Sequence, residues 1–164
     1  MIQHYGLEQA ETSVKERKGW RKPKRILVGG FAAQFGPALQ SAAPDVEFIV
    51  AGSPDAKAKL ATIDAAVGIC NAEMLAAAKS IQWIQMVTSG EENCLSVPAV
   101  KERNILVTNM QRASGPIIAE HVIGLTFAFT RGLDLFMQAR SEGQWRRETT
   151  PGRMAVVVGK TMLR

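Results

Sequence analysis

The sequence has 164 residues, 46% of them hydrophobic, which suits one folded domain or one domain and part of a second. No apolar run reaches the roughly 18–20 residues of a membrane span, and no apolar stretch precedes Ile26, so neither a transmembrane segment nor a secretory signal is expected. With only two histidines, a multi-histidine metal site is not expected either.

The net charge of +5 is concentrated near the N-terminus. Seven of the 20 Lys and Arg side chains lie in residues 15–25, beside one acidic residue, Glu16. Such a segment could bind nucleic acid or an anionic surface. However, Trp20 is its single aromatic side chain, and no series of stacking platforms accompanies it. We therefore interpret residues 1–24 as a basic, disordered leader and do not expect nucleic-acid binding.

Cys70 and Cys94 belong to no CxxC motif and to no cluster with histidine. Cysteine without such neighbours is most often a small buried side chain with a free thiol in a reducing compartment. The sequence therefore predicts two free thiols and a cytoplasmic location.

From Arg25 onward, short apolar runs alternate with segments of helical spacing. The runs are apolar on both faces, which is typical of buried parallel strands. Strands are expected at 25–28, 46–50, 65–69, 81–88 and 105–108, with helices at 31–43, 55–63, 71–78 and 92–104. This alternation predicts an α/β fold in which residues 25–113 form a flavodoxin-like, doubly wound parallel sheet.

Apolar spacing also predicts which helical side chains face the sheet. Asn71 is expected to cap the helix that follows it, because its side chain can accept a hydrogen bond from a free backbone N–H. The expected core-facing positions are Phe31, Phe35, Leu39, Leu60, Ile63, Leu75, Ala78, Leu95, Val97 and Val100.

The longest expected element is one continuous helix in residues 114–144. Ser114 or Gly115 can cap it, Pro116 fits its first turn, and Gly143 suits its end. About 27 residues would extend for roughly 40 Å. Part of its apolar stripe is therefore expected to pack on something beyond the α/β unit. The stripe consists of Ile118, Val122, Leu125, Phe129, Leu133 and Phe136.

Ligands of a doubly wound sheet bind beyond the carboxyl ends of its strands. After the fourth strand, residues 88–90 are small, so backbone N–H groups there could approach an anion, although an ordinary βα turn has the same composition. Glu91 and Glu92 would oppose an anion if they turned inward. After the fifth strand, Arg112 could pair with a substrate carboxylate or face solvent.

Several other functions are not expected. His121 shares a helix face with small and apolar residues and lacks a nucleophilic partner, so we interpret it as a packing residue. No GxGxxG or GxxxxGK[ST] phosphate loop occurs. Residues 29–34 contain neither the acidic residues of a phosphoacceptor receiver nor the Ser and Thr of a flavin-phosphate loop.

Taken together, several short motifs resemble the D-isomer-specific 2-hydroxyacid dehydrogenases, which include phosphoglycerate, glyoxylate/hydroxypyruvate and formate dehydrogenases. These motifs are Trp83-Ile84-Gln85, Thr88-Ser89-Gly90, the run 101–109 (KERNILVTN), the run 119–125 (AEHVIGL) and Gly143-Gln144-Trp145. The resemblance implies a substrate lobe, a connecting helix and a Rossmann domain that binds NAD or NADP. It also implies a homodimer that transfers hydride between C2 of a small D-2-hydroxy acid and the nicotinamide.

The resemblance also implies a substrate site. Backbone N–H groups of the loop that matches Ser89, Gly90 and Glu91 would hold the carboxylate of a 2-hydroxy or 2-keto acid. Arg112 and Ser114 follow in the next loop, where the family often has Asn at the position of Ser114. Glu91 and Glu92 replace an apolar residue and an Asp.

Residues 159–163 resemble the entry to the first Rossmann strand. The chain is therefore expected to be an N-terminal fragment of an NAD(P)-dependent dehydrogenase, with residues 145–164 as a connector and an incomplete start of the nucleotide-binding domain. No catalytic, cofactor-binding or metal-binding residue is expected in it, and no tight binding of NAD or NADP. The alternative is a stand-alone module that binds a small carboxylate or dimerises, without catalysis.

Overall fold

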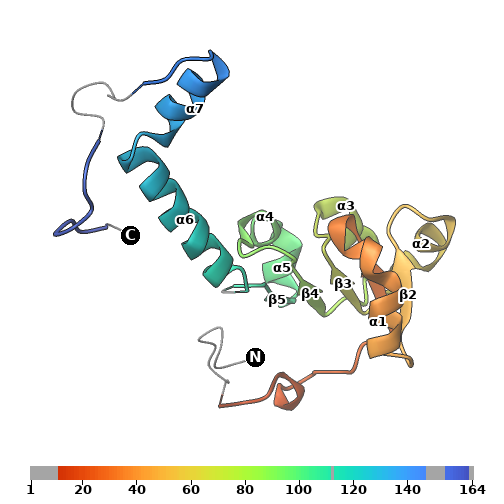
Figure 1. The fold of residues 1–164 in the computed structure, drawn as a ribbon. Helices are drawn as coiled ribbons and strands as arrows, with labels where there is room; N and C mark the ends of the chain where they lie inside the picture. The colour runs from red at the N-terminus through yellow and green to blue at the C-terminus, as the bar shows by residue number, and fades with distance from the viewer. Residues whose placement is uncertain (1–10, 112, 147–153, 163–164) are drawn as a thin grey trace. The chain divides into compact units, whose positions relative to one another are not determined.

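The structure is a computed structural model, which describes residues 11–111, 113–146 and 154–162. The chain divides into two compact units, Met1–Ala113 and Ser114–Arg164. The first holds the sheet with its covering helices, and the second holds two further helices (Figure 1). Among the described residues, no helix is long and apolar enough to cross a membrane.

The first unit is built on a five-stranded parallel sheet with strand order β2-β1-β3-β4-β5. All five strands lie where apolar runs predicted them, although the hydrogen-bonded ladder covers only part of most runs. Because the strands are parallel, their carboxyl ends share one edge of the sheet. The strands are β1 Arg25–Val28, β2 Glu47–Val50, β3 Ala65–Val67, β4 Trp83–Gln85 and β5 Leu106–Thr108.

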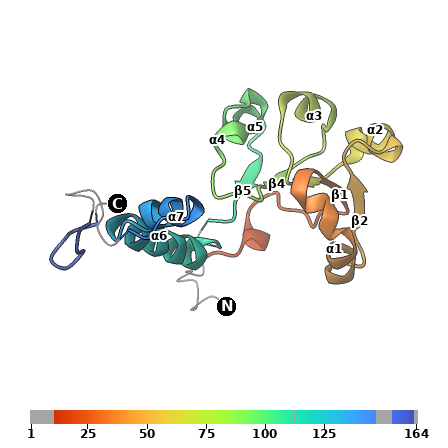
Figure 2. The same cartoon turned by 45° about the horizontal axis from the view of Figure 1, so that its top comes forward.

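Helices cover both faces of this sheet, so the predicted doubly wound α/β fold is confirmed (Figure 2). Leu27, Ile49 and Ile84 form one buried layer with α2 Pro54–Lys59, α3 Ala72–Ala77 and α5 Pro98–Glu102. Ile26, Val28 and Ala65 form the other layer with η3 Gly30–Phe35 and α1 Gly36–Ala42. Successive side chains of β1 belong to alternate layers, because they point to opposite faces of the sheet.

The predicted helix 31–43 begins as a 3-10 helix, and its expected core positions are wrong at two residues. Phe31 and Phe35 are 65% and 46% exposed and contact each other edge to face, whereas Ala32 is buried. In a 3-10 helix the side chains repeat every three residues, so a four-residue spacing no longer marks one face.

The predicted helix 92–104 is two short helices, α4 Glu92–Leu95 and α5 Pro98–Glu102. Pro98 causes the break, because it lacks an N–H and disfavours helical backbone at the preceding residue. Val97 is accordingly extended, with φ −79° and ψ 115°. Leu95 is 54% exposed, contrary to the prediction, while Val100 is buried as expected.

Helix α3 follows its prediction closely. Asn71 caps it by accepting a hydrogen bond from the Met74 backbone N–H at 2.8 Å, and Leu75 and Ala78 are buried. Its C-terminal carbonyls are satisfied by a residue that the sequence did not single out. The Arg103 guanidinium donates to the carbonyls of Leu75 and Ala78, both at 2.8 Å, and so joins α5 to the end of α3.

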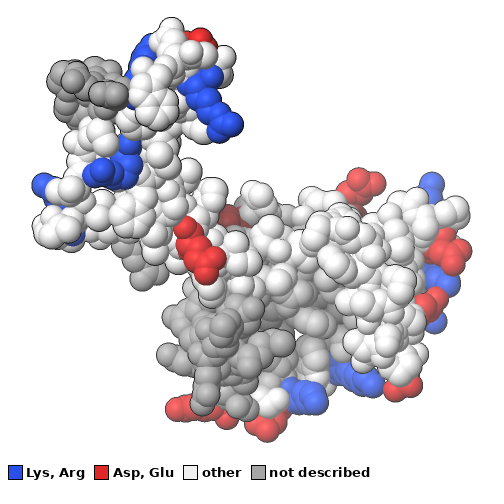
Figure 3. Space-filling model, viewed as in Figure 1, with Lys and Arg blue, Asp and Glu red and all other residues white. Residues whose placement is uncertain are grey.

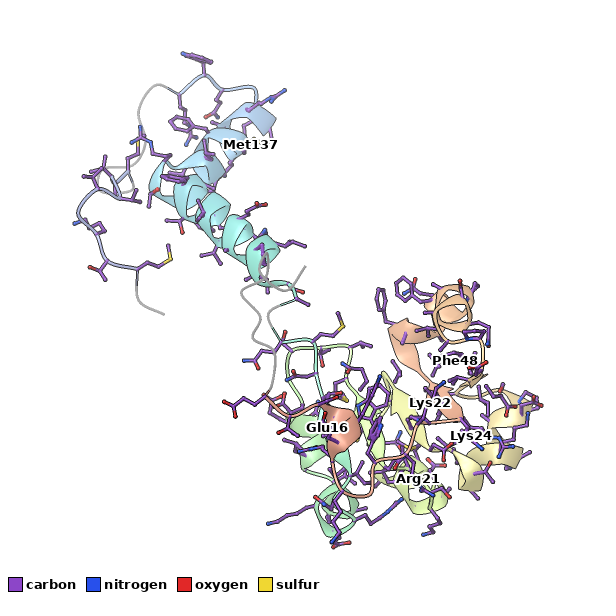
Figure 4. All side chains as sticks on the ribbon, turned by 90° about the horizontal axis from the view of Figure 1, so that it is seen from below. Glu16, Arg21, Lys22, Lys24, Phe48 and Met137 are labelled. Atoms are coloured by element: carbon purple, nitrogen blue, oxygen red, sulfur yellow. A yellow bond between two sulfur atoms is a disulfide. The ribbon has the colours of Figure 1, made fainter. Side chains whose placement is uncertain are left out.

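Residues 20–24 pack against the sheet, so the prediction that residues 1–24 form a disordered leader does not hold for this part. The Trp20 ring meets the Trp83 ring edge to face, with centroids 6.1 Å apart. Gln82 Nε2 donates to the Arg21 carbonyl at 2.7 Å, and the Asp64 carboxylate accepts from the Lys24 N–H at 2.9 Å. Figure 4 shows Arg21, Lys22 and Lys24 along the segment that enters β1. Residues 1–10 lie outside the described residues.

The second unit contains α6 Gly115–Thr130 and α7 Leu133–Ser141, so the prediction of one continuous helix is wrong. Gly132 separates them in a left-handed conformation, with φ 64°. The apolar stripe continues across this break, and its spacing therefore gave no sign of it. Residues 159–163 are the expected entry to a Rossmann strand. The described residues 154–162 form no strand, since a strand needs a partner to complete its hydrogen bonds.

The apolar stripe of α6 remains exposed in its own unit. Ile118, Leu125 and Phe129 are 57%, 44% and 59% exposed, and the surface over α6 is largely uncharged (Figure 3). Ser114 precedes α6 without a side-chain capping bond, so its predicted capping role is not observed.

Gly68 tests the close approach of the two backbone segments that follow β1 and β3 at the carboxyl edge. Its φ is +72°, and a Cβ there would lie 2.7 Å from the Gly29 carbonyl oxygen. Gly68→Ala is therefore expected to lower the free energy of unfolding by about 2 kcal/mol or more. Urea unfolding, followed by tryptophan fluorescence in a Trp145→Phe background, would measure it in the first unit.

Gly36→Ala is the matched control. Gly36 has helical backbone, and a Cβ there meets nothing within 4 Å. This substitution is expected to leave stability unchanged or to raise it by up to about 1 kcal/mol. Equal losses in the two variants would contradict the close approach inferred at Gly68.

Candidate functional site

Two loops at the carboxyl edge of the sheet form the candidate site. Residues 88–91 follow β4, and residues 109–111 follow β5, its neighbour in the sheet. The Met110 N–H donates to the Thr88 carbonyl at 3.0 Å, which extends the β4–β5 pairing into the loops. The sheet order thus brings together two segments that the sequence separates.

The Asn109 side chain fixes the first loop to the second. Its Nδ2 donates to the Ser89 carbonyl at 2.8 Å and to Glu91 Oε2 at 2.6 Å. Its Oδ1 accepts from the Gln111 N–H at 3.2 Å. Within the first loop, Thr88 Oγ1 donates to the Gly90 carbonyl at 2.8 Å. The loop carbonyls are therefore hydrogen-bonded from the protein side.

The backbone N–H groups of Ser89, Gly90 and Glu91 remain available. Within the described part of the chain, none of the three donates a hydrogen bond. Ser89 and Gly90 are exposed, so these donors are accessible to a solvent-borne ligand. Consecutive free N–H groups on a fixed loop suit a small anion such as a carboxylate.

Two carboxylates oppose an anion at this loop. Glu91 is held by Asn109, and Glu92 Oε2 lies 2.5 Å from the position that a Cβ would take at Gly90. Glu92 is exposed and its side chain is flexible, so it can turn into solvent at little cost. Arg112, the predicted cation of the second loop, lies outside the described residues.

A cavity of about 430 Å³ adjoins the loops and is lined by Glu91, Val107, Thr108, Asn109 and Gln111. This volume is within the range of small-molecule sites. Thr108 stabilises its wall, because Thr108 Oγ1 accepts from Trp83 Nε1 at 2.8 Å and donates to Gln85 Oε1 at 2.7 Å.

The structure thus brings only some of the predicted site residues close to one another. Ser89, Gly90 and Glu91 lie on one loop, while Ser114 is exposed and belongs to the second unit. The anchoring roles of Asn109 and Thr108 were missed. A polar residue directly after a buried strand was the available signal for Asn109, but its partners are distant in sequence.

The prediction of two free thiols is wrong, because Cys70 and Cys94 form a disulfide with Cα atoms 5.4 Å apart. Cys70 follows β3 and Cys94 lies in α4, so both belong to segments that leave the carboxyl edge from adjacent strands. Their 24-residue separation concealed this proximity.

His121 is exposed on α6, so the predicted packing role is not observed within the second unit. Among the residues that the structure describes, no group of three or more His, Cys, Asp or Glu side chains could hold a metal ion.

Comparison with known proteins identifies the family. Residues 33–162 match the family described as "D-isomer specific 2-hydroxyacid dehydrogenase, catalytic domain". The chain belongs to this family. A hydroxypyruvate reductase of Thermotoga maritima is 31% identical over 91 residues, which are 56% of this chain and 29% of the reductase.

Solved structures of this family share the fold. A D-lactate dehydrogenase from Aquifex aeolicus, in complex with NAD and lactic acid, has a TM-score of 0.63 at 16% identity, covering 76% of this chain and 39% of that one. An NADPH-dependent glyoxylate/hydroxypyruvate reductase from Sinorhizobium meliloti, in complex with NADP and sulfate, has a TM-score of 0.63 at 16% identity, covering 78% and 42%. The matched part of this chain therefore covers less than half of either protein.

Asn109→Ala tests the junction of the two loops. It removes the donor to the Ser89 carbonyl and to Glu91, so we expect the free energy of unfolding to fall by about 1–2 kcal/mol. The matched control is Gln111→Ala, in the same loop, whose exposed side chain makes no hydrogen bond to the described residues and whose effect should stay within about 0.5 kcal/mol. Urea unfolding of both variants measures the difference, and equal effects would contradict the anchoring role.

Proposed function

We propose that this chain supplies the substrate-binding lobe of an NAD(P)-dependent oxidoreductase that acts on the CH–OH group of small D-2-hydroxy acids. The loop of Ser89, Gly90 and Glu91 carries the proposal, because its three N–H groups have no hydrogen-bond acceptor among the described residues and the loop adjoins a cavity of about 430 Å³. The family of the chain supports the same substrate class.

The residues of the lobe would act by positioning. The free N–H groups donate to the two carboxylate oxygens of the acid, and the Asn109 anchor keeps those donors in place before the ligand arrives. Fixing the carboxylate limits where C2 can lie, which lowers the entropic cost of the reacting geometry. Arg112 and Ser114 remain sequence-based predictions of carboxylate contacts: Arg112 lies outside the described residues, and Ser114 belongs to the second unit.

The 164-residue sequence contains no GxGxxG turn, so we assign no contact with NAD or NADP to its residues. In a protein that also carries a dinucleotide-binding domain, the nicotinamide would exchange hydride with C2 of the acid. We propose that the 164 residues alone do not catalyse this reaction, and that the intact enzyme is a cytoplasmic homodimer.

Glu92→Gln tests the carboxylate site, because this substitution is expected to raise the affinity for the ligand rather than to lower it. If the two like charges lie roughly 5 Å apart, Coulomb's law in water gives about 0.8 kcal/mol of repulsion, so its removal should lower the Kd for D-lactate about fourfold. The control is Glu102→Gln at the end of α5, near the start of β5 and hence toward the amino ends of the strands. Isothermal titration calorimetry at low salt measures both variants, and the difference should shrink at high ionic strength. An unchanged Kd in Glu92→Gln would contradict the assigned site.

The second candidate function is a non-catalytic module that binds a small carboxylate and dimerises. The exposed apolar side chains of α6, such as Ile118 and Phe129, favour it. A dimer of defined size in light scattering, from a gene that encodes no dinucleotide-binding domain, would support this candidate over the dehydrogenase.

A further inference from the structure

The Cys70–Cys94 disulfide lies next to the candidate carboxylate loop. Cys94 is three residues beyond Glu91, and the Glu91 carbonyl accepts hydrogen bonds from the N–H groups of Cys94 and Leu95, both at 2.9 Å. One turn of helix therefore connects the disulfide to the loop. Through Cys70, the same bond reaches the turn between β3 and α3.

The disulfide links α4 covalently to the core. This helix has four residues, too few to be stable by its own hydrogen bonds. Cys94 is its one buried residue, at 0% exposure, while Leu95 is 54% exposed. Loss of the covalent bond would remove the one cross-link that holds this buried side chain to the segment after β3.

The surroundings of Cys70 and Cys94 are compatible with both a disulfide and two free thiols. Cys94 lies in the apolar cluster with Met74, Leu75 and Val100, where a neutral thiol packs as a small hydrophobic group. Cys70 is partly buried and Cys94 is fully buried. Of the two residues, Cys70 is therefore the one on which reduction starts in this proposal.

We infer that Cys70 and Cys94 form a reversible redox-modification site that sets how firmly the 88–91 loop is held. In reduction, a thiolate of a dithiol attacks Cys70 Sγ, the S–S bond breaks, and Cys94 leaves as a thiolate that takes up a proton. The second thiol of the reagent then releases Cys70, and the reagent becomes a cyclic disulfide. In oxidation, a small-molecule disulfide accepts the two electrons and is released as two thiols.

The two states differ in how the loop is anchored. In the disulfide form, Asn109 holds the loop from β5, and α4 holds it from the core. In the dithiol form, the hydrogen bonds of Asn109 and Met110 still hold the loop from the β5 side, but the covalent link to the core is lost. The free N–H groups of Ser89, Gly90 and Glu91 are then less well fixed, so a carboxylate binds more weakly. This last consequence rests on the proposed function.

The experiment compares the oxidised 164-residue chain with the same chain in dithiothreitol. Thiol alkylation with mass spectrometry counts the reduced cysteines, and hydrogen exchange reports on residues 94–97, whose N–H groups are hydrogen-bonded. We expect exchange there to rise about tenfold on reduction, while β3 at 65–67 is unchanged. The Kd for D-lactate should rise at least about threefold.

Cys70→Ala is the control variant. It should show the faster exchange in both buffers, with no further response to dithiothreitol. Equal exchange in the oxidised and reduced chains, or reduction only after global unfolding, would overturn the redox proposal even if D-lactate binds. A change in exchange without D-lactate binding to either form would instead support the redox site and contradict the proposed function.

Discussion

The Asn109 side chain is the interaction on which the candidate site depends. One amide group holds the Ser89 carbonyl and the Glu91 carboxylate, and it is itself placed by the last residues of β5. A loop of small residues without such an anchor would sample many conformations, and its N–H groups would offer no defined site. Because the anchor uses the carbonyl and the carboxylate, it leaves the N–H donors free for a ligand.

The arrangement of the sheet makes this anchor possible. Strand order β2-β1-β3-β4-β5 places β4 beside β5 and β3 beside β4 at one carboxyl edge. The first adjacency brings Asn109 to the 88–91 loop, and the second brings Cys70 to Cys94. The hydrogen bonds of Asn109 and the disulfide therefore both restrain the same short loop.

Local sequence patterns predicted the strands well, because a parallel strand buried on both faces must be apolar throughout. The patterns failed where a single residue interrupted the helical backbone. Pro98 split one expected helix, and Gly132 split another although the apolar spacing continued across it. The 3-10 turn at Phe31 moved two aromatic side chains to the surface, an effect that four-residue spacing does not reveal.

The site was predictable only in part, for a related reason. Ser89 and Gly90 were identified because small residues after a strand are a local signal. The partners of Asn109, the disulfide and the packing of Trp20 on Trp83 all join residues distant in sequence, so they follow from the completed sheet rather than from any one segment.

We propose that the N–H groups of the 88–91 loop bind the carboxylate of a small 2-hydroxy acid. A titration of the 15N-labelled chain with D-lactate, followed by NMR, tests this binding at the three amides themselves. We expect saturable downfield shifts of the amide protons of Ser89, Gly90 and Glu91, with smaller changes elsewhere in the sheet. Saturable shifts confined to another region, or no shifts at these three amides, would contradict it.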